Sequence, residues 1–230
     1  YISVTGVQAC ALPISESIDV MDAQGCNIRV DARGPQVMRV LPRLNEEVNE
    51  EWISDKARHA CDGLNRQRLD RPYVRINGKL KPASWAEAFA AIADKVRATS
   101  PDKMAAIVGD LAAAEEIKAL KDLMGSLRVT NIDCRQDGAK ISGGPRQTYL
   151  FNSTIMGVEA ADAILLVGAN PRWDAPVLNA RIRKAWLASG VKVASIGPQV
   201  ELTYPVEQLG TDITVLEQIA GGSHRSEEHT

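Results

Sequence analysis

Residues 163–197 read AILLVGANPRWDAPVLNARIRKAWLASGVKVASIG, in which two apolar runs flank a segment with helical spacing. Short apolar runs bounded by glycine are typical of strands that are buried on both faces. Two such strands joined by a helix form a β-α-β unit, whose crossover connection makes the strands parallel. We therefore predict strands at 164–168 and 191–197, with a helix from Asp174 to Leu187 between them.

A second unit of the same kind precedes it. AAIVG (105–109) predicts a strand, AAAEEIKALKDLMGSL (112–127) a helix and RVTNID (128–133) another strand. Upstream, Ser84 and Glu87 form a capping-box pattern at the start of a helix that continues through Val96. The sequence thus predicts an α/β fold with a Rossmann-like parallel sheet, which ends in a loop with two prolines and a short helix, DITVLEQIA.

The N-terminal part has a different pattern. Alternating runs at 27–30 and 36–41 predict a β-hairpin, and a second hairpin is predicted within 72–82, with its turn at Asn77-Gly78. Ser54 is expected to cap a short helix. The acidic run between the first hairpin and this helix, LNEEVNEE, is expected to be a solvated surface segment. This part is a small, β-rich module.

Composition excludes several classes of protein. The 230 residues carry a formal net charge of −2, so nucleic acid is not expected as a partner. No apolar run approaches the roughly 20 residues needed to span a bilayer, so any membrane association is expected to be indirect. The four cysteines are scattered without a C-x-x-C pair, which indicates neither a disulfide framework nor a zinc site.

Four long stretches resemble one family, the large iron–sulfur subunit of respiratory complex I in its α-proteobacterial and mitochondrial form. The stretches are ESIDVMDAQGCNIRV, VMRVLPRLNEEVNEEWISDKAR, DGLNRQRL and VEAADAILLVGANPRWDAPVLNARIRKAW. The resemblance covers about 15–223. It implies a fold of the molybdopterin oxidoreductase type. It also implies that 2Fe-2S and 4Fe-4S clusters belong to an N-terminal part of the full-length subunit that lies outside this chain.

The resemblance also identifies the positions of a lost cluster. Molybdopterin enzymes such as formate dehydrogenases hold a four-iron cluster on Cys-x2-Cys-x3-Cys and a distant fourth Cys. Laid on this sequence, those positions are Asp19, Asp22, Cys26 and Ser54. One thiolate replaces four, so we expect this fragment to bind no iron–sulfur cofactor. Carboxylates and a thiolate suit different ions, so no metal is expected either, and Asp19 and Asp22 should cap turns in a surface loop.

Two further segments resemble cofactor contacts of molybdopterin enzymes. The loop Gly168–Pro171 lies where open α/β sheets bind nucleotides, but it has one glycine, and Asp174 would compete with an anion for the free amides. We interpret it as a structural remnant. The stretch around Cys134 resembles the approach to a molybdenum ligand, yet Ala139 and Lys140 offer no thiol or hydroxyl there. Cys134 is expected to be a packing residue.

No catalytic, cofactor-binding or metal-binding residue is predicted. His59 lies on the short helix, and His224 and His229 lie at the C-terminal end, so no nucleophile–His–acid set can be assembled. The basic stretch formed by Arg181, Arg183 and Lys184 is expected to be a solvated helix face, which could also dock a neighbouring subunit.

The chain ends look foreign to the rest. SVTGVQACALPIS and RSEEHT resemble translated sequencing-adapter DNA, so the chain is expected to be a fragment. The expected division is 1–14 as a non-native extension, 15–82 as a degenerate 4Fe-4S-like module, 83–223 as an incomplete Rossmann-like domain, and 224–230 as a non-native tail.

The resemblance implies a scaffold role in the peripheral arm of an NADH:quinone oxidoreductase. That enzyme passes electrons from NADH through flavin and iron–sulfur clusters to quinone, with ion translocation. The fragment itself is not expected to be catalytic. Expected partners are other peripheral-arm subunits, at the cytoplasmic face of a bacterial inner membrane or the matrix side of the mitochondrial one. Two alternatives remain: a molybdopterin-dependent oxidoreductase of the formate dehydrogenase type, and a nucleotide-binding α/β module.

Overall fold

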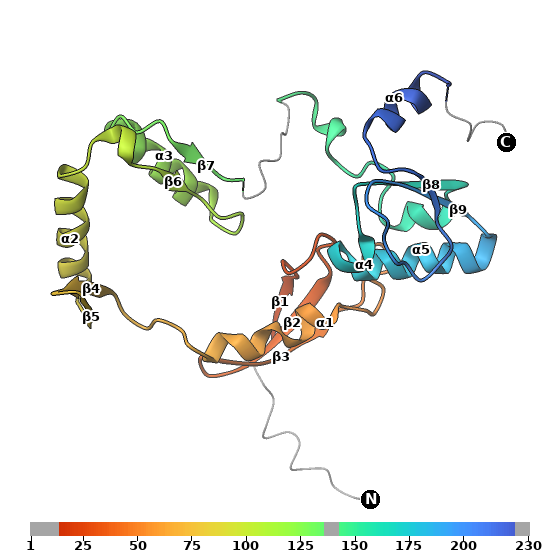
Figure 1. Cartoon of the computed structure of the whole chain (residues 1–230). Coiled ribbons are helices and arrows are strands. Elements are labelled where there is room, and N and C mark those ends of the chain that lie inside the picture. The colour runs from red at the N-terminus through yellow and green to blue at the C-terminus, as the bar shows by residue number, and fades with distance from the viewer. Residues whose placement is uncertain (1–13, 136–142, 224–230) are drawn as a thin grey trace, which may run out of the picture. The chain divides into compact units, whose positions relative to one another are not determined.

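A computed structural model describes residues 14–135 and 143–223 (Figure 1). The chain divides into two compact units. The first consists of Tyr1–Gln67 together with Leu150–Thr230, and the second of Arg68–Tyr149. The chain therefore leaves the first unit and returns to it. Within the described ranges, no helix is both long enough and apolar enough to cross a membrane.

The first unit begins with a three-stranded antiparallel sheet in the order β1 (Ile14–Ile18), β2 (Asn27–Arg33) and β3 (Gln36–Pro42). The β2–β3 hairpin confirms the sequence prediction, and its turn uses Gly34 at φ +57°. Strand β1 was not predicted. Its five residues, ISESI, are all exposed and lack a run of apolar residues, so the backbone pairing with β2 is what defines it.

Helix α1 (Asp55–His59) and the 3₁₀ helix η2 (Ala60–Asn65) follow β3 along the chain, and residues of both helices join the core of this sheet. The predicted cap is confirmed, since the Ser54 hydroxyl accepts the N–H of Ala57 at 3.2 Å. The core beneath them is formed by Cys26, Ile28, Val40, Ile53, Ala57, Cys61 and Val177. Because Val177 comes from far along the chain, this core joins the N-terminal sheet to the C-terminal half of the same unit.

That C-terminal half is a parallel sheet in the order β10 (Glu207–Gly210), β9 (Lys192–Ile196) and β8 (Ala163–Val167). The crossover from β8 to β9 contains α4 (Pro171–Asp174) and α5 (Pro176–Ser189), and α6 (Thr214–Ala220) follows β10. The predicted β-α-β unit is confirmed. Its helix was misplaced at the start, because Asp174 ends α4 and the proline at the first turn of α5 separates the two helices.

The second unit contains two small sheets. The hairpin β4 (Tyr73–Ile76) and β5 (Lys79–Pro82) turns at Asn77 and Gly78, both with positive φ, as predicted. Helix α2 (Trp85–Arg97) starts with the predicted capping box. The strands β6 (Ala106–Ile107) and β7 (Ile132–Asp133) are parallel and flank α3 (Ala114–Ser126), which confirms the second β-α-β unit.

The α/β class is therefore confirmed at the coarse level. The parallel strands nevertheless fall into two separate sheets in the described residues, one in each unit. A sequence pattern gives strand direction but not which strands become neighbours. Three further 3₁₀ helices complete the description: η3 (Pro101–Lys103), η4 (Arg146–Thr148) and η5 (Met156–Ala160).

Candidate functional site

The loop between β1 and β2 contains three of the four positions that the family resemblance aligns with cluster ligands. The loop is closed by the Asp19 N–H, which donates to the Cys26 carbonyl at 2.8 Å. Asp19 Oδ1 accepts the Met21 N–H at 2.9 Å, and Asp22 Oδ1 accepts the Gln24 N–H at 3.0 Å. Both aspartates thus cap turns, as predicted. The predicted surface position is wrong for Asp19, which is only 3% exposed.

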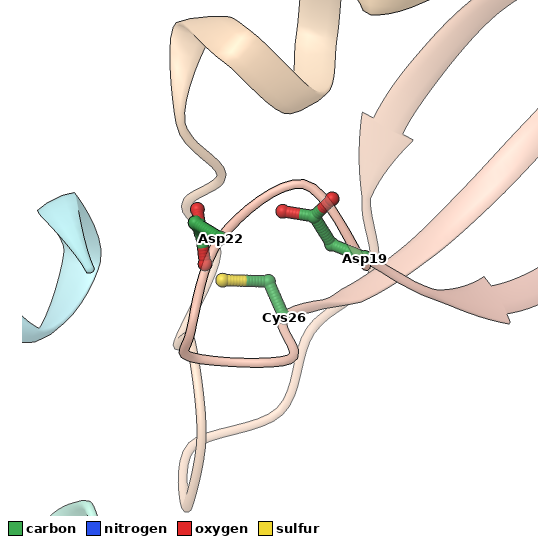
Figure 2. A group of neighbouring side chains, drawn as sticks. All are labelled: Asp19, Asp22 and Cys26. Atoms are coloured by element: carbon green, nitrogen blue, oxygen red, sulfur yellow. The ribbon is translucent and has the colours of Figure 1, made fainter. Parts of the chain in front are cut away.

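The three side chains converge inside this loop, as Figure 2 shows. One potential ligand atom from each of Asp19, Asp22 and Cys26 lies within 4.8 Å of the other two. Cys26 has no exposed surface. The loop is also held from outside, because the Ala23 N–H donates to the carbonyl of Asp174 in α4 at 2.8 Å.

The loop contains buried carboxylate oxygens without hydrogen-bond donors. The second carboxylate oxygens, Asp19 Oδ2 and Asp22 Oδ2, are buried and have no hydrogen-bond partner among the described residues. Burial raises the pKa of Asp19, although the hydrogen bond from Met21 opposes the shift. Burial also raises the pKa of the Cys26 thiol to about 12, and the charges of Asp22 and Asp19 add to the effect. Burial therefore disfavours the charged forms of Asp19 and Cys26.

Ser54, the fourth of these aligned positions, does not join this group. Its hydroxyl is used in the cap of α1, and the side chain is buried. Cys61, by contrast, is a second buried thiol in the same apolar core as Cys26. Its Sγ donates a weak hydrogen bond to the carbonyl of Arg58 at 3.7 Å. The structure thus brings together three of the four predicted positions and leaves Ser54 with a structural role.

The Gly168–Pro171 loop follows β8 and contains Gly168 at φ +60°. The prediction that Asp174 would compete with an anion is confirmed, because its Oδ2 accepts the N–H of Asn170 at 2.9 Å. A Cβ at Gly197 would lie 3.2 Å from the Gly168 Cα, so the ends of β8 and β9 approach closely. The Gly168 N–H also donates to the carbonyl of Ile196 at 2.8 Å, so two amides of the loop are not available to a phosphate.

The segment that resembles a molybdenum site lies in the second unit. Cys134 is exposed, so its interpretation as a packing residue is wrong. Asp133 accepts hydrogen bonds from Arg135, which lower the pKa of that carboxyl to about 2. Asn131 donates to the carbonyl of Met104 at 3.1 Å. The positions expected for a metal ligand, 139–140, lie outside the described residues.

The basic stretch on α5 is not a solvated face throughout. Arg181 is only 2% exposed and pairs with Glu159 at 2.6 Å. It also donates to the backbone carbonyl of Glu46 and lies 3.9 Å from Glu50. Lys184, one turn further along, contacts Glu50 at 2.5 Å and Glu159 at 3.0 Å. Two of these partners come from the acidic run LNEEVNEE, which was expected to be solvated and instead covers Arg181.

The remaining basic and histidine positions are exposed or lie outside the described residues. Arg183 is exposed and donates to the carbonyl of Thr203. His59 is exposed on α1. His224 and His229 lie outside the described residues. Sequence reasoning missed the burial of Arg181, and the available signal was its spacing of about one turn from Val177 and Ala185, which lie on an apolar face.

Two family models match successive parts of the chain. Residues 68–228 match the model described as "Molybdopterin oxidoreductase". Residues 13–62 match the model described as "NADH-ubiquinone oxidoreductase NDSU1/NuoG-like, 4Fe-4S domain". The three converging side chains therefore belong to a segment of 4Fe-4S type.

Curated relatives are about equally similar in bacteria and mitochondria. The chain is 51% identical over 208 residues to the G subunit of the NADH-quinone oxidoreductase of Rickettsia conorii, which covers 90% of this chain and 31% of that protein. It is 47% identical over 211 residues to "NADH dehydrogenase [ubiquinone] iron-sulfur protein 1, mitochondrial" of Solanum tuberosum, covering 91% and 29%. It is 50% identical over 213 residues to "NADH-ubiquinone oxidoreductase 78 kDa subunit, mitochondrial" of Candida albicans, covering 91% and 30%. The chain thus spans less than a third of these relatives.

The expectation that this fragment carries no iron–sulfur cofactor is wrong, because residues 13–62 match a 4Fe-4S domain. The low count of thiolates was taken to mean that the cluster had been lost from a module whose fold was kept. The donors at this loop still differ from the usual ligand set. Four-iron clusters are held on four Cys thiolates, whereas this loop offers Cys26 and two carboxylates. The residues around Cys26 thus retain a cluster-type fold with a donor set that does not fit a standard cluster.

Proposed function

This chain belongs to the molybdopterin oxidoreductase family, within the group formed by the large iron–sulfur subunits of complex I. From this membership we propose that it serves as a structural scaffold in the peripheral arm of an NADH:quinone oxidoreductase. The enzyme as a whole would pass electrons from NADH through flavin and iron–sulfur clusters to quinone, with ion translocation. This chain would contribute no catalytic residue of its own. Its partners would be other peripheral-arm subunits.

The buried Arg181 cluster is the observation that carries the scaffold proposal. Arg181 and Glu159 lie in the molybdopterin oxidoreductase match, whereas Glu46 and Glu50 lie in the 4Fe-4S match. A buried guanidinium with several acceptors is held in one geometry, since any shift leaves a charge unpaired in a poorly solvated place. The cluster therefore fixes the 4Fe-4S module on the C-terminal half, as a scaffold for electron carriers requires.

We also propose an arrangement for residues 83–223 and a location for the chain. A Rossmann-like arrangement of 83–223 is supported by two parallel β-α-β units that fall within a single family match. The domain boundary expected from the sequence, at 82–83, remains a prediction. The compact units divide at other places, after Gln67 and before Leu150. We place the chain peripherally, on the cytoplasmic face of a bacterial inner membrane or the matrix side of the mitochondrial one.

Substitution of Arg181 in the full-length subunit, within its intact complex, tests the scaffold role. Arg181→Ala should lower the amount of assembled complex several-fold, while the NADH:quinone turnover of each assembled complex stays near that of the wild type. Arg183→Ala is the matched control, because it removes the same side chain from an exposed position of the same helix. Native gel electrophoresis measures assembly, and activity is normalised to flavin content. Full assembly with lost turnover would contradict the scaffold role and indicate a catalytic one.

A further inference from the structure

In the loop of Asp19, Asp22 and Cys26, the potential ligand atoms lie close to the spacing found around a bound metal ion. One ligand atom from each side chain lies within 4.8 Å of the others. A tetrahedral ion with bonds of about 2.0–2.3 Å holds its ligands roughly 3.5 Å apart. The required contraction is therefore within the reach of small side-chain rotations. Figure 2 shows the three side chains directed toward a common interior of the loop.

The same loop has buried carboxylate oxygens that no donor among the described residues reaches. Asp19 is only 3% exposed, and its Oδ2 has no hydrogen-bond partner. Asp22 Oδ2 is in the same state. Neither carboxylate forms an ion pair within 14–135 or 143–223. The pKa of Asp19 is affected by Asp22, through its charge and a side-chain hydrogen bond, and in the opposite direction by Lys56. A buried carboxylate oxygen without a donor is costly, and a bound cation would remove that cost.

The other atoms of the carboxylates are already fixed. Asp19 Oδ1 and Asp22 Oδ1 accept backbone N–H groups of Met21 and Gln24, which leaves each Oδ2 as the free oxygen. Hydrogen bonds of this kind orient metal-binding carboxylates in known sites. The bond from Ala23 to the carbonyl of Asp174 anchors the loop from outside. The site is thus preorganised for monodentate coordination by both aspartates.

From this geometry we propose that Asp19, Asp22 and Cys26 bind one divalent transition-metal ion of the zinc, cobalt or ferrous class. The donor set selects this class. A thiolate disfavours calcium and magnesium, which take oxygen ligands, and two carboxylates disfavour the cuprous ion. On binding, the Cys26 thiol becomes a thiolate and its proton passes to the solvent. Three protein ligands leave a fourth position for water. The inference goes beyond the scaffold role and does not depend on it.

Cobalt titration of the purified 230-residue chain, freed of metal with a chelator, tests this assignment. We expect one cobalt ion per chain and a thiolate-to-cobalt charge-transfer band in the near ultraviolet, both abolished by added zinc. Cys26→Ser should remove the band. Asp22→Asn, at a less buried position, should weaken cobalt binding by at least roughly tenfold, comparable with the effect of disturbing the surroundings of a metal site.

Two cysteine controls distinguish the site from adventitious thiol binding. Cys134→Ser removes an exposed thiol, and Cys61→Ser removes a buried one in the same core; both should keep the band and the stoichiometry. Far-ultraviolet circular dichroism establishes that each variant is folded. The assignment is overturned if the wild-type chain binds no cobalt, or if the band persists in Cys26→Ser. It is also overturned if iron and sulfide analysis finds four of each, since that result identifies a cluster in place of a single ion.

Discussion

Arg181 illustrates how one residue joins parts of the chain that lie far apart in sequence. A guanidinium that is 2% exposed needs acceptors on every side, because desolvation would otherwise cost several kcal/mol. The structure supplies Glu159 and the carbonyl of Glu46, whereas Arg181 Nε has no hydrogen-bond partner among the described residues. Lys184 shares Glu159 and Glu50, so two cations balance two carboxylates in the cluster.

This balance predicts a dependence of stability on pH. Burial alone would raise the pKa of Glu159, but hydrogen bonds from Lys184 and Arg181 outweigh it and hold that pKa below its ordinary value of 4.5. A carboxyl with a lowered pKa in the folded state stabilises it fully above the unfolded pKa. That contribution is lost as pH falls through the folded pKa. The free energy of unfolding should therefore decrease below about pH 5.

Glu159→Gln isolates this contribution from other carboxyls with lowered pKa values, such as Asp133 and Asp212. The variant should be less stable by roughly 2 kcal/mol at pH 7, because Arg181 loses a charged acceptor. Its unfolding free energy should also change less steeply with pH in the acidic range. Urea denaturation of both proteins between about pH 7 and pH 3.5 measures the difference. Parallel curves for the two proteins would show that Glu159 does not stabilise the fold through its charge.

At the level of single residues, sequence alone predicted local chemistry well and burial poorly. The turn caps by Asp19 and Asp22 and the competition by Asp174 follow from short-range hydrogen bonds, which depend only on neighbouring residues. The burial of Asp19 and Arg181 and the exposure of Cys134 depend on which distant segment covers them. For Arg181, its place on an apolar helix face was a local signal. For Asp19 and Cys134, no pattern within a few residues contains that information.

Among the helices, α2 offers the most direct test of a local signal. Ser84 Oγ accepts the Glu87 N–H at 3.3 Å, and the Glu87 carboxylate accepts the Ser84 N–H at 2.7 Å. Loss of a capping hydroxyl typically costs about 1 kcal/mol of helix stability. Ser84→Ala should therefore lower the unfolding free energy of the second unit by about that amount, as measured by denaturant titration of the whole chain.

Ser100 provides the matched control for this measurement. It occupies the N-cap position of η3 in the same unit, but its side chain makes no capping hydrogen bond. Ser100→Ala should change the unfolding free energy by only a few tenths of a kcal/mol, as is usual for surface substitutions. Equal effects of the two substitutions would show that the capping box contributes nothing beyond the loss of a polar side chain.

Elements were predicted where a turn signal and an apolar run coincide, and were missed elsewhere. The hairpin at Asn77-Gly78 and the crossover from β8 to β9 have both signals. Strand β10 has neither, since EQLG contains one apolar residue, and it exists because β9 offers it a backbone to pair with. The break between α4 and α5 could have been predicted from Pro176, because its ring disfavours a helical conformation at Ala175.

For the whole molecule, the two units differ in how much apolar surface they bury. The first unit has two buried clusters, one beneath the antiparallel sheet and one around the parallel sheet. In the described part of the second unit, the buried residues are Ala88, Ala106 and Val129. Its strands β6 and β7 have two residues each. Local stability depends on buried contacts, so the second unit should open far more readily than the first.

Hydrogen exchange followed by mass spectrometry on the whole chain tests this difference. Amides of β2, β3, β8 and β9 should exchange slowly, through global unfolding of the first unit, whereas those of β6, β7 and α3 should exchange orders of magnitude faster through local opening. The comparison is internal, since both units experience the same pH, temperature and solvent. Equal protection would mean that exposed apolar residues of α2, such as Trp85, Phe89 and Ile92, are covered in solution, and the large exposed surface of that helix would then have to be assigned to an interface.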